Sequence, residues 1–512
     1  MISIHTHAKA VPLVADPILL LRELQQQHPS KPFVLLESAD MSTHQSTKSI
    51  LMIQSALQIS SRNSEVTVKS ITPFGQAFLK QLQENLKSHV VDQSENTARF
   101  RFDKLSSDLS LKDRLKAPSS LDVLRRVMHV AKVDPLFQDR FLLMGLFAYD
   151  FIDQIEDLPA AKQDELGFPD FIFFVPEVLL VTHHASQQTE LIQHGLDGDG
   201  EIPPPPFIKG DFFASPFEKG GQGDFPVNHS PDISDTEFKQ LVETVKKRIV
   251  LGDVFQIVPS RTFKAPCTNP LLAYEILRSL NPSPYMYFVY DADFEILGAS
   301  PETFIKVDSY RQVTIKPIAG TRRRGFDGQG QIDPELDIRL EAELKLNTKE
   351  VAEHMMLVDL ARNDIARICK TKSRTVPRLM QVDRYSHVMH LVSEVSGELK
   401  DDLDALHAYQ ASMNMGTLVG APKIKAAQIL REVENTKRGP YGGAIGYLDA
   451  RGVMDTAILI RTAIVKNQTA YVRAGAGVVF DSCPDDETLE THNKAEAVLK
   501  AITLSNIDGA KS

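Results

Sequence analysis

Apolar and polar positions alternate with two different periods along this chain, and the longer period predicts helices. Residues 238, 241, 242, 245 and 249 are apolar and recur at helical spacing. Ser234 and Glu237 form a capping-box pattern before this stripe, and Gly252 supplies a stop after it. The same period predicts helices over 17–27, 348–364 and about 481–502.

Shorter apolar runs bounded by turn residues predict strands. The run FLLMGLFAY at 141–149 is about half as long as the ~20 residues needed to cross a bilayer, so it is expected to be a buried strand. Antiparallel pairing is favoured, because the turns are short and the helices are too few for a βαβ repeat. The predicted fold class is therefore α+β with large sheets. Further expected strands are 33–36, 171–175, 288–296, 313–318, 444–448, 457–465 and 470–480.

One segment interrupts this regular patterning. EIPPPPFIKGDFFASPFEKGGQGDFP (201–226) holds two copies of P-F-x-K-G and is rich in Pro and Gly, which disfavours both a helix and a central strand. We interpret it as a flexible insertion or linker, with peptide docking through its prolines as the alternative. The expected organisation is an N-terminal region (1–195), an insertion (196–232), a second structured region (233–505) and a tail (506–512).

Composition narrows the class of protein. The 512 residues are 42% hydrophobic and 24% charged, which is typical of a folded globular chain. The net charge is −10, from 57 basic and 67 acidic residues, and the basic residues are scattered, which argues against a nucleic-acid-binding face. Three cysteines without CxxC spacing and an N-terminus without a secretion signal favour a cytoplasmic location.

The stretch KPIAGTRRRG (316–325) is suited to holding an anion. A strand is expected to end before Pro317, and the chain is expected to turn through Gly320 and Thr321 ahead of three arginines. Backbone N–H groups, a hydroxyl and positive charge all favour an anionic ligand. The alternative is a tight turn followed by solvated basic residues.

Two predicted helices carry carboxylates that could hold a metal ion. Glu350 and Glu353 lie one turn apart on the helix over 348–364, and Glu490 lies on the helix over 481–502. Glu353 and Glu490 would suit Mg²⁺, which takes oxygen ligands and often needs only one or two carboxylates besides an anionic substrate. The alternative is a solvated helix edge, and spacing alone does not bring the two helices together.

Other residues point to chemistry less directly. His390 lies in an apolar strand-like run and is either a structural hydrogen-bonding group or a general base. Arg461 follows an apolar run, where a buried guanidinium needs an anionic partner. Gly475 and Gly477 allow close approach of a ligand or another backbone. The chain contains neither a GxxxxGKS phosphate loop nor a GxSxG elbow, so a nucleotide or serine-hydrolase reading has no support.

Taken together, several stretches resemble the chorismate-utilising enzymes and, among them, the large subunit (component I) family of anthranilate synthases. The resemblance is specific over about 234–505 and extends to LLESAD (35–40) and GLFAYDFID (145–153) in the N-terminal half. The Pro/Gly segment departs from the family pattern. The stretches that carry the resemblance are GDVFQIVPSR (252–261), NPSPYMYF (281–288), GASPETF (298–304), PIAGTRRRG (317–325), EHMMLVDLARND (353–364), VDRYSHVMHLVSEVSGEL (382–399), MNMGTLVGAPKIKA (413–426), GPYGGAIGY (439–447), IRTA (460–463) and AGAGVV (474–479).

This resemblance implies two large antiparallel β-sheets flanked by helices, and a site for chorismate. It implies that Glu353 and Glu490 hold Mg²⁺, that His390 is the base which removes the ring proton, and that Thr417 orients the leaving groups. Glu350 is the candidate acid for the departing hydroxyl. The implied substrate contacts are Gly320, Thr321, Tyr441, Arg461, Gly475, Ala476 and Gly477.

The implied activity is that of a lyase which converts chorismate and ammonia to anthranilate and pyruvate, the first step of tryptophan biosynthesis. Aminodeoxychorismate synthases of the family typically carry a nucleophilic lysine where this chain has Ala319. Isochorismate and salicylate synthases carry a water-activating lysine where it has Gln256. Both differences favour anthranilate, and a sibling that makes aminodeoxychorismate, aminodeoxyisochorismate or isochorismate remains the alternative.

The source of ammonia is expected to be another chain. No cysteine lies in a G-x-C-x-G nucleophile turn, so a glutamine amidotransferase subunit (component II) and a hetero-oligomer are implied.

The family's tryptophan feedback site is also matched, and tryptophan is the expected allosteric inhibitor. The alternatives are an ordinary strand end with a proline-rich turn, or a non-catalytic tryptophan sensor. The residues expected around tryptophan are Glu37, Ser38, Pro284, Tyr285, Met286 and Tyr447.

Overall fold

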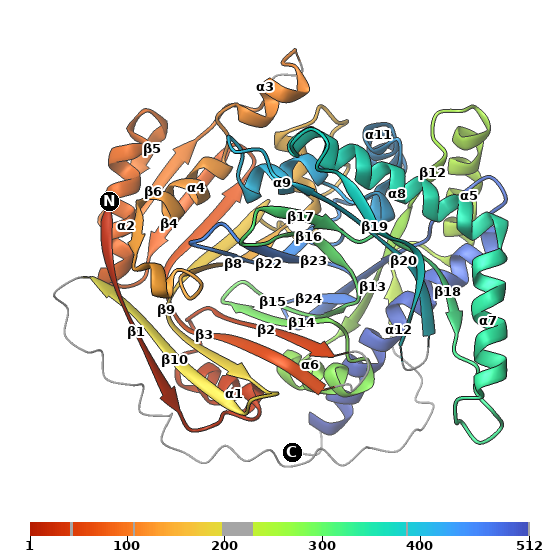
Figure 1. The fold of residues 1–512 in the computed structure, drawn as a ribbon, viewed down its shortest axis with the longest axis horizontal. Coiled ribbons are helices and arrows are strands. Elements are labelled where there is room, and N and C mark those ends of the chain that lie inside the picture. The colour runs from red at the N-terminus through yellow and green to blue at the C-terminus, as the bar shows by residue number, and fades with distance from the viewer. Residues whose placement is uncertain (41–44, 106–107, 197–228, 386–387, 510–512) are drawn as a thin grey trace.

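The structure is a computed structural model that describes residues 1–40, 45–105, 108–196, 229–385 and 388–509 (Figure 1). The Pro/Gly-rich stretch 201–226 lies outside the described residues. No helix in the described part of the chain combines the length and the apolar character that a membrane crossing requires.

The helices are α1 (Pro17–Gln27), α2 (Pro73–Asn85), α3 (Leu111–Lys116), α4 (Leu121–Val130), α5 (Asp235–Val250), α6 (Pro270–Leu280), α7 (Pro334–Leu346), α8 (Thr348–Ile368), α9 (Ala405–Ser412), α10 (Gly416–Val419), α11 (Lys423–Val433) and α12 (Pro484–Gly509). The strands of the first half are β1 (Ile2–Val11), β2 (Phe33–Asp40), β3 (Gln45–Arg62), β4 (Glu65–Ser70), β5 (Val90–Gln93), β6 (Thr97–Arg101), β7 (Ala131–Val133), β8 (Leu142–Phe147), β9 (Phe171–His183) and β10 (Gln188–Leu196). Those of the second half are β11 (Ser230–Pro231), β12 (Gln256–Ile257), β13 (Ser260–Pro266), β14 (Tyr285–Asp291), β15 (Phe294–Ser300), β16 (Thr303–Val307), β17 (Gln312–Ile315), β18 (Ile318–Arg323), β19 (Thr375–Arg384), β20 (Val388–Glu398), β21 (Gly420–Ala421), β22 (Ala444–Asp449), β23 (Met454–Ile458), β24 (Thr462–Lys466) and β25 (Thr469–Gly475).

The predicted α+β class with antiparallel sheets flanked by helices is confirmed. Hydrogen bonds join 23 of the described strands into one continuous network, and β12 pairs with β21 apart from it. The N-terminal and C-terminal halves share this network, because β2 pairs with β14 and β8 pairs with β22. Figure 1 shows the N-terminal strands entering the same body as the later ones, with helices around the outside.

The strands read as continuous apolar runs because both of their faces are buried. In β2, Phe33 and Leu35 face a core shared with α1, α6 and α12, whereas Val34 faces a second core built almost entirely from strands. Successive side chains of a strand point to opposite faces, so a strand between two apolar layers needs apolar residues at every position. In β15 the same alternation places Leu297 in the first of these cores and Ile296 in the second.

The best-defined helix prediction is confirmed in detail. Helix α5 begins after Ser234, whose side chain accepts from the Glu237 N–H while the Glu237 carboxylate accepts from the Ser234 N–H. Helix α8 covers the predicted 348–364 and begins after Asn347, whose side chain accepts from the Glu350 N–H. Helix α12 extends to Gly509, beyond the predicted end at 502.

Several predicted strands were wrong in their extent. The run 313–318 is divided between β17 and β18, and the strand predicted over 470–480 ends at Gly475. The run 288–296 is two strands, β14 and β15, which form a hairpin around a turn at 291–294. The run 457–465 is likewise divided between β23 and β24, and Arg461 lies between them with φ of +51°. The breaks did carry a polar signal, from Asp291 and Asp293 in the first run and Arg461 in the second, which the prediction of single strands did not take into account.

The predicted turn at Gly320 and Thr321 is also corrected. Both residues lie within β18, where the pairing with β20 shifts register between Ala319 and Thr321 and Gly320 has φ of +81°. This is a β-bulge, which a glycine in the left-handed region allows and which redirects the following side chain.

Candidate active site

Strands β18 and β20 bring the anion-binding stretch beside the candidate base. Thr321 and His390 are register partners, and Thr321 Oγ1 lies 2.9 Å from His390 Nδ1. Burial lowers the pKa of His390 to about 4, and the nearby charge of Arg461 lowers it further. The imidazole is therefore neutral near pH 7, which is the form able to accept a proton.

Two of the three arginines of KPIAGTRRRG form ion pairs with carboxylates of this chain. Arg322 forms an ion pair with Glu350, and Arg324 holds Asp337 through two bonds of 2.8 and 2.9 Å. The second carboxylate oxygen of Glu350 is buried without a hydrogen-bond partner, and a Cβ at Gly320 would lie 2.5 Å from it. Gly320 thus permits Glu350 to approach the bulge.

The two predicted metal ligands converge from separate helices. Burial raises the pKa of Glu353 on α8, and the charges of Glu350 and of Glu490 on α12 raise it further against the opposing charge of Lys349. Glu490 itself pairs with Lys494 at 2.5 Å. Two carboxylates that repel each other in this way are a suitable place for a cation.

A third carboxylate lies beside this pair, and the sequence reasoning missed it. Glu487 is one turn before Glu490 on α12 and is 6% exposed, and one of its oxygens has no partner. Burial raises its pKa to about 6, and the charge of Glu490 contributes to the rise. The i, i+3 spacing of two glutamates was the signal that could have found it.

These side chains fit a divalent ion. Unpartnered, buried oxygens on Glu350 and Glu487 flank Glu353 and Glu490. No three ligand-type side chains among the described residues are close enough to enclose an ion by themselves. Mg²⁺ is commonly bound by one or two carboxylates with waters and substrate oxygens completing the shell, so Glu353 and Glu490 would be its ligands.

The glycines of AGAGVV allow close contacts with Tyr441, Pro259 and Gln256. A Cβ at Gly475 would lie 2.9 Å from Tyr441 Oη and 2.7 Å from the Pro259 carbonyl oxygen, so only glycine allows this approach. Lys494 donates to the Gly475 carbonyl at 3.0 Å, and Ala476 donates its N–H to Pro259. A Cβ at Gly477 would lie 3.0 Å from Gln256 Nε2.

The charge of Arg461 interacts with residues from both of these groups. Burial lowers its pKa, while the neighbouring Tyr441 and Glu490 act in the opposite direction. Its charge also acts on His390. The predicted base, metal ligands and substrate contacts are therefore linked pair by pair through contacts and charge interactions: Thr321 with His390, then Arg461 and Tyr441, then Gly475, Lys494 and Glu490, and finally Glu353, Glu350 and Gly320.

The most strongly perturbed acid linked to these residues was not predicted. Glu302, from the GASPETF stretch, is 6% exposed and accepts a hydrogen bond of 3.2 Å from Thr417 Oγ1. Burial raises its pKa to about 8, against the opposing hydrogen bond from Thr417 and the charge of Lys494. Glu302 is thus protonated at neutral pH, whereas Glu350 is paired with a guanidinium. The only signal in the sequence that could have found this acid was a charged residue, Glu302, in a region of buried strands.

A cavity of about 150 Å³ is lined by residues of the predicted regulatory site. Glu37, Ser38, Tyr285, Met286 and Tyr447 line it, and Pro284 directly precedes β14 outside the lining. The Glu37 carboxylate is held by Tyr274, Ser49 and Arg278, so it is part of a buried network as well as of the wall.

Two charged residues of this cavity were not predicted. Lys48 and Asp455 also line it. Burial lowers the pKa of Lys48, and Asp455 accepts a hydrogen bond of 2.9 Å from Tyr285 Oη. A cavity lined by a lysine, two acidic residues and aromatic side chains suits an aromatic amino acid.

Antiparallel sheets carry paired carboxylates, a neutral imidazole and a buried arginine, and the class of the protein follows from the family match: this chain belongs to the family of chorismate-binding enzymes, whose model matches residues 79–500. It is similar to anthranilate synthase component 1 of Vibrio parahaemolyticus, at 44% identity over 97% of this chain and 92% of that protein. Component 1 of Escherichia coli is also 44% identical, over 96% of this chain and 95% of its own length.

Solved structures agree with this assignment. The crystal structure of anthranilate synthase component I from Streptococcus pneumoniae superposes with a TM-score of 0.64 at 33% identity, covering 94% of this chain and 97% of that one. The menaquinone-specific isochorismate synthase of Escherichia coli has a TM-score of 0.66 at 18% identity and covers 98% and 95%, which shows a shared fold alone.

Proposed function

We propose that this chain is the catalytic subunit of a lyase that converts chorismate and ammonia to anthranilate, pyruvate and water. The supporting observation is the linkage of Glu353, Glu490, His390 and Arg461 through charge interactions in a chain similar to component 1 proteins over nearly its whole length. Such an enzyme begins tryptophan biosynthesis and works in the cytoplasm.

Chorismate would be bound by charged groups and by backbone that can approach it closely. Chorismate is a dicarboxylate, so Arg461 and the Tyr441 hydroxyl would hold the enolpyruvyl carboxylate, while the Gly475–Gly477 backbone and the Thr321 hydroxyl contact the rest. Mg²⁺, when held by Glu353 and Glu490, would supply Lewis-acid stabilisation of the ring carboxylate. A buried guanidinium with no bulk water around it favours an anionic ligand strongly.

In the first chemical step, ammonia adds at ring C2 and the C4 hydroxyl leaves as water. The departing oxygen needs a proton, and Glu302 is the better donor because its pKa is near 8 and Thr417 orients it. This places Glu302 in the role that the sequence suggested for Glu350. Glu350, which pairs with Arg322, would instead support the metal site.

In the second step, His390 would remove the C2 proton while the C3–O bond breaks and pyruvate departs, which makes the ring aromatic. Its neutral state and its contact with Thr321 Oγ1 suit this role. Ala319 and Gln256 cannot act as the lysine nucleophile or base of the sibling activities.

Ammonia would come from a separate glutamine amidotransferase subunit, since the name component 1 of the relatives implies a second component. Tryptophan would bind in the 150 Å³ cavity and inhibit. Lys48 would then contact its carboxylate and Asp455 its ammonium group.

The product assay tests the proposal. Purified protein with chorismate, Mg²⁺ and ammonium sulfate should yield fluorescent anthranilate and an equal amount of pyruvate. Aminodeoxychorismate or isochorismate as the only product would assign the chain to a sibling activity. Tryptophan binding without turnover would make it a sensor.

A further inference from the structure

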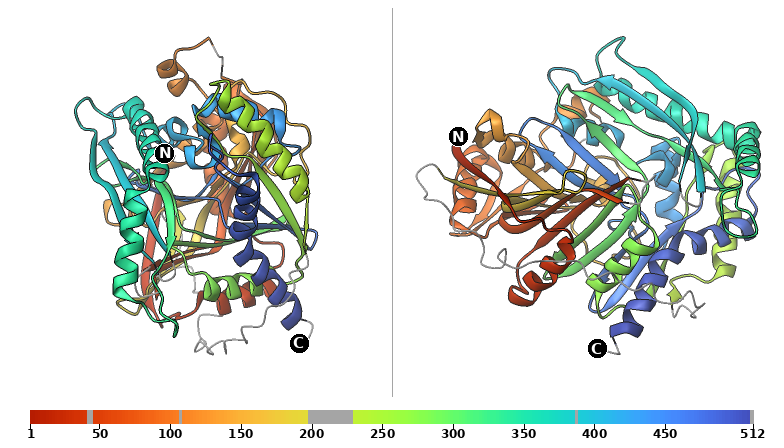
Figure 2. Two further views of the ribbon diagram at one scale, coloured as in Figure 1. Left: turned by 90° about the vertical axis from the view of Figure 1, so that its right-hand side faces the viewer. Right: turned by 60° about the horizontal axis from the view of Figure 1, so that its bottom comes forward.

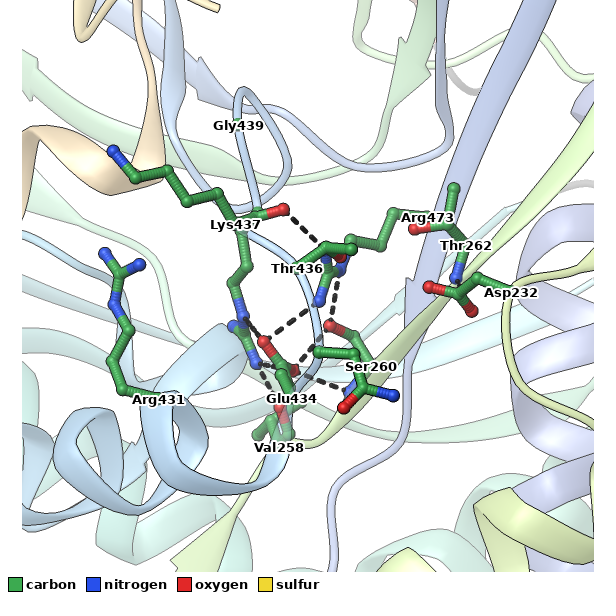
Figure 3. Close-up of polar contacts among 12 residues, drawn as sticks. Asp232, Val258, Ser260, Thr262, Arg431, Glu434, Thr436, Lys437, Gly439 and Arg473 are labelled. Atoms are coloured by element: carbon green, nitrogen blue, oxygen red, sulfur yellow. Dashed lines mark hydrogen bonds and ion pairs between the residues drawn. The ribbon is translucent and has the colours of Figure 1, made fainter. Parts of the chain in front are cut away.

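Behind Tyr441 lies a buried ionic cluster that the proposed chemistry does not use. Its centre is Glu434, just after α11, whose side chain is 5% exposed. One carboxylate oxygen accepts from the Ser260 N–H at 2.9 Å, from the Ser260 hydroxyl at 2.7 Å and from Arg438 Nη2 at 2.6 Å. The other accepts from Arg438 Nε at 2.9 Å and from Arg473 Nη2 at 3.0 Å. Figure 3 shows these groups converging on Glu434.

The two arginines extend the cluster to four segments. Arg438 donates to the carbonyls of Leu418 and Val258, each at 2.7 Å. Arg473, on β25, donates to Ser260 Oγ at 2.8 Å, and also to Thr436 Oγ1 and the Lys437 carbonyl. The cluster therefore ties the loop after α11 to β13, to β25 and to the end of α10.

This loop carries Tyr441. The Tyr441 N–H donates to the Arg438 carbonyl at 3.3 Å, and the Arg438 guanidinium lies 5.7 Å from the centre of the Tyr441 ring. On the other side, Ser260 is the register partner of Gly475 in the β13–β25 pair. Glu434 thus binds directly to one residue on each side of the contact between Tyr441 and Gly475.

We infer that Glu434 is a positioning residue for substrate binding: through Arg438 and Arg473 it sets the place of the Tyr441 hydroxyl over the Gly475 backbone. The inference rests on the proposed function, in which Tyr441 and Gly475 contact chorismate. Glu434 itself does not touch the substrate.

Charge and packing support this role over a merely structural one. One carboxylate balances two guanidinium groups, so the cluster keeps one net positive charge behind the Tyr441 ring, which favours a dianionic substrate. The cavity next to it measures about 10 Å³, the lower limit for a single water, so the cluster is closely packed.

Glu434→Gln tests the inference because glutamine keeps the size but loses one acceptor and the charge. We expect the KM for chorismate to rise at least about tenfold, with a smaller change in kcat and an unchanged Mg²⁺ dependence at saturating chorismate. A KM within twofold of the parent value in a folded Glu434→Gln protein would overturn the inference. A lowered kcat at unchanged KM would overturn it as well.

Two further variants keep the test decisive. Ser260→Ala removes one hydroxyl but no charge, and should raise the KM in the same direction by less; if Glu434→Gln does not fold, an unchanged KM in Ser260→Ala overturns the inference. Glu190→Gln breaks the carboxylate–guanidinium pair with Arg140 in the N-terminal half and should leave the KM unchanged. Absence of anthranilate from the parent protein would instead refute the proposed function.

Discussion

At the scale of single residues, burial decides which ionisable group takes which role. His390 and Glu302 come from ordinary-looking strand regions, and burial moves their pKa values in opposite directions, to about 4 and about 8. Burial disfavours the charged form of each group, so the base is left neutral and the acid is left protonated at neutral pH. A pair with pKa values pushed apart in this way is able to supply one acid and one base.

The pH dependence of kcat/KM should reflect this pair. Glu302 loses its proton as the pH rises through about 8, so we expect the rate to fall above that pH, while His390 stays neutral down to about pH 4. Glu302→Gln should lower the rate by about 10²–10⁴-fold and remove the alkaline limb from what remains.

A steady-state profile between pH 5 and 9.5 with ammonia concentration held constant is the measurement. Glu295→Gln is a matched control, because burial also raises the pKa of Glu295, to about 7, at a position on β15 with Gln25 as its partner. An alkaline limb that persists in Glu302→Gln would show that another group donates the proton.

At the scale of elements, two helices far apart in sequence supply the carboxylates of the proposed metal site. The N-terminal part of α8 presents Glu350 and Glu353, and α12 presents Glu487 and Glu490. Helix α12 packs on α5 and α6, as Figure 2 shows, and Arg261 donates to Thr491 Oγ1, next to Glu490, at 3.0 Å. Packing on remote elements therefore places carboxylates that neither helix could place alone.

Glu353→Gln should weaken metal binding without lowering the stability of the fold. Activity and apparent Mg²⁺ affinity should fall by about 10–100-fold, because a ligand is lost. Since the pKa of Glu353 is raised in the folded state, its ionisation weakens folding as the pH rises above the unfolded-state value, so the neutral variant should be at least as stable at pH 7.

Mg²⁺ titrations of activity and thermal melts without metal would check both parts. Glu343→Gln, on the exposed face of α7, is the control. An unaltered Mg²⁺ titration in Glu353→Gln would exclude Glu353 as a ligand.

At the scale of the whole molecule, the shared sheet network joins the two sites. The cavity proposed to bind tryptophan is lined from β2 and β3 of the N-terminal half and from β14, β22 and β23 of the C-terminal half. Strand β23 continues through Arg461 into β24, so the same strands that line the cavity lead to the substrate site. A ligand in the cavity can therefore influence the site through paired strands.

Ser38→Ala should weaken tryptophan inhibition without abolishing catalysis. The Ser38 hydroxyl lies 2.7 Å from Thr47 Oγ1, and Ser38 lines the cavity from β2, a strand that carries none of the proposed catalytic groups. We expect the inhibition curve to shift about tenfold toward higher tryptophan with kcat near the parent value, given that a lost hydrogen bond to a charged group is worth about 1.5–3 kcal/mol.

Inhibition curves for Ser38→Ala and for Ser60→Ala, on β3 outside this cavity, form the comparison. A curve for Ser38→Ala that superposes on that of the parent would contradict the assignment of the cavity.

The elements that were predictable are those whose signals are local. The α5 capping box and the α8 cap depend on residues three apart, and both are present as expected. The division of 457–465 at Arg461 and the bulge at Gly320 were not predictable, because each depends on which strand lies alongside. Glu302 and Lys48 were missed for a similar reason: the sequence around a charged residue carries no information about what faces it in the folded chain.

By itself, the sequence determined which residue types were available and which stretches would be helix or strand, because caps, periods and turn residues act over a few positions. It also determined family membership, through motifs that are specific as a set. Only the tertiary structure decided that the charges of Glu353 and Glu490 interact, that Glu302 is buried with a raised pKa while Glu350 pairs with Arg322, and that Glu434 joins four segments behind Tyr441. Burial and electrostatic coupling depend on what surrounds a side chain from every direction, and that surrounding is assembled from residues hundreds of positions apart.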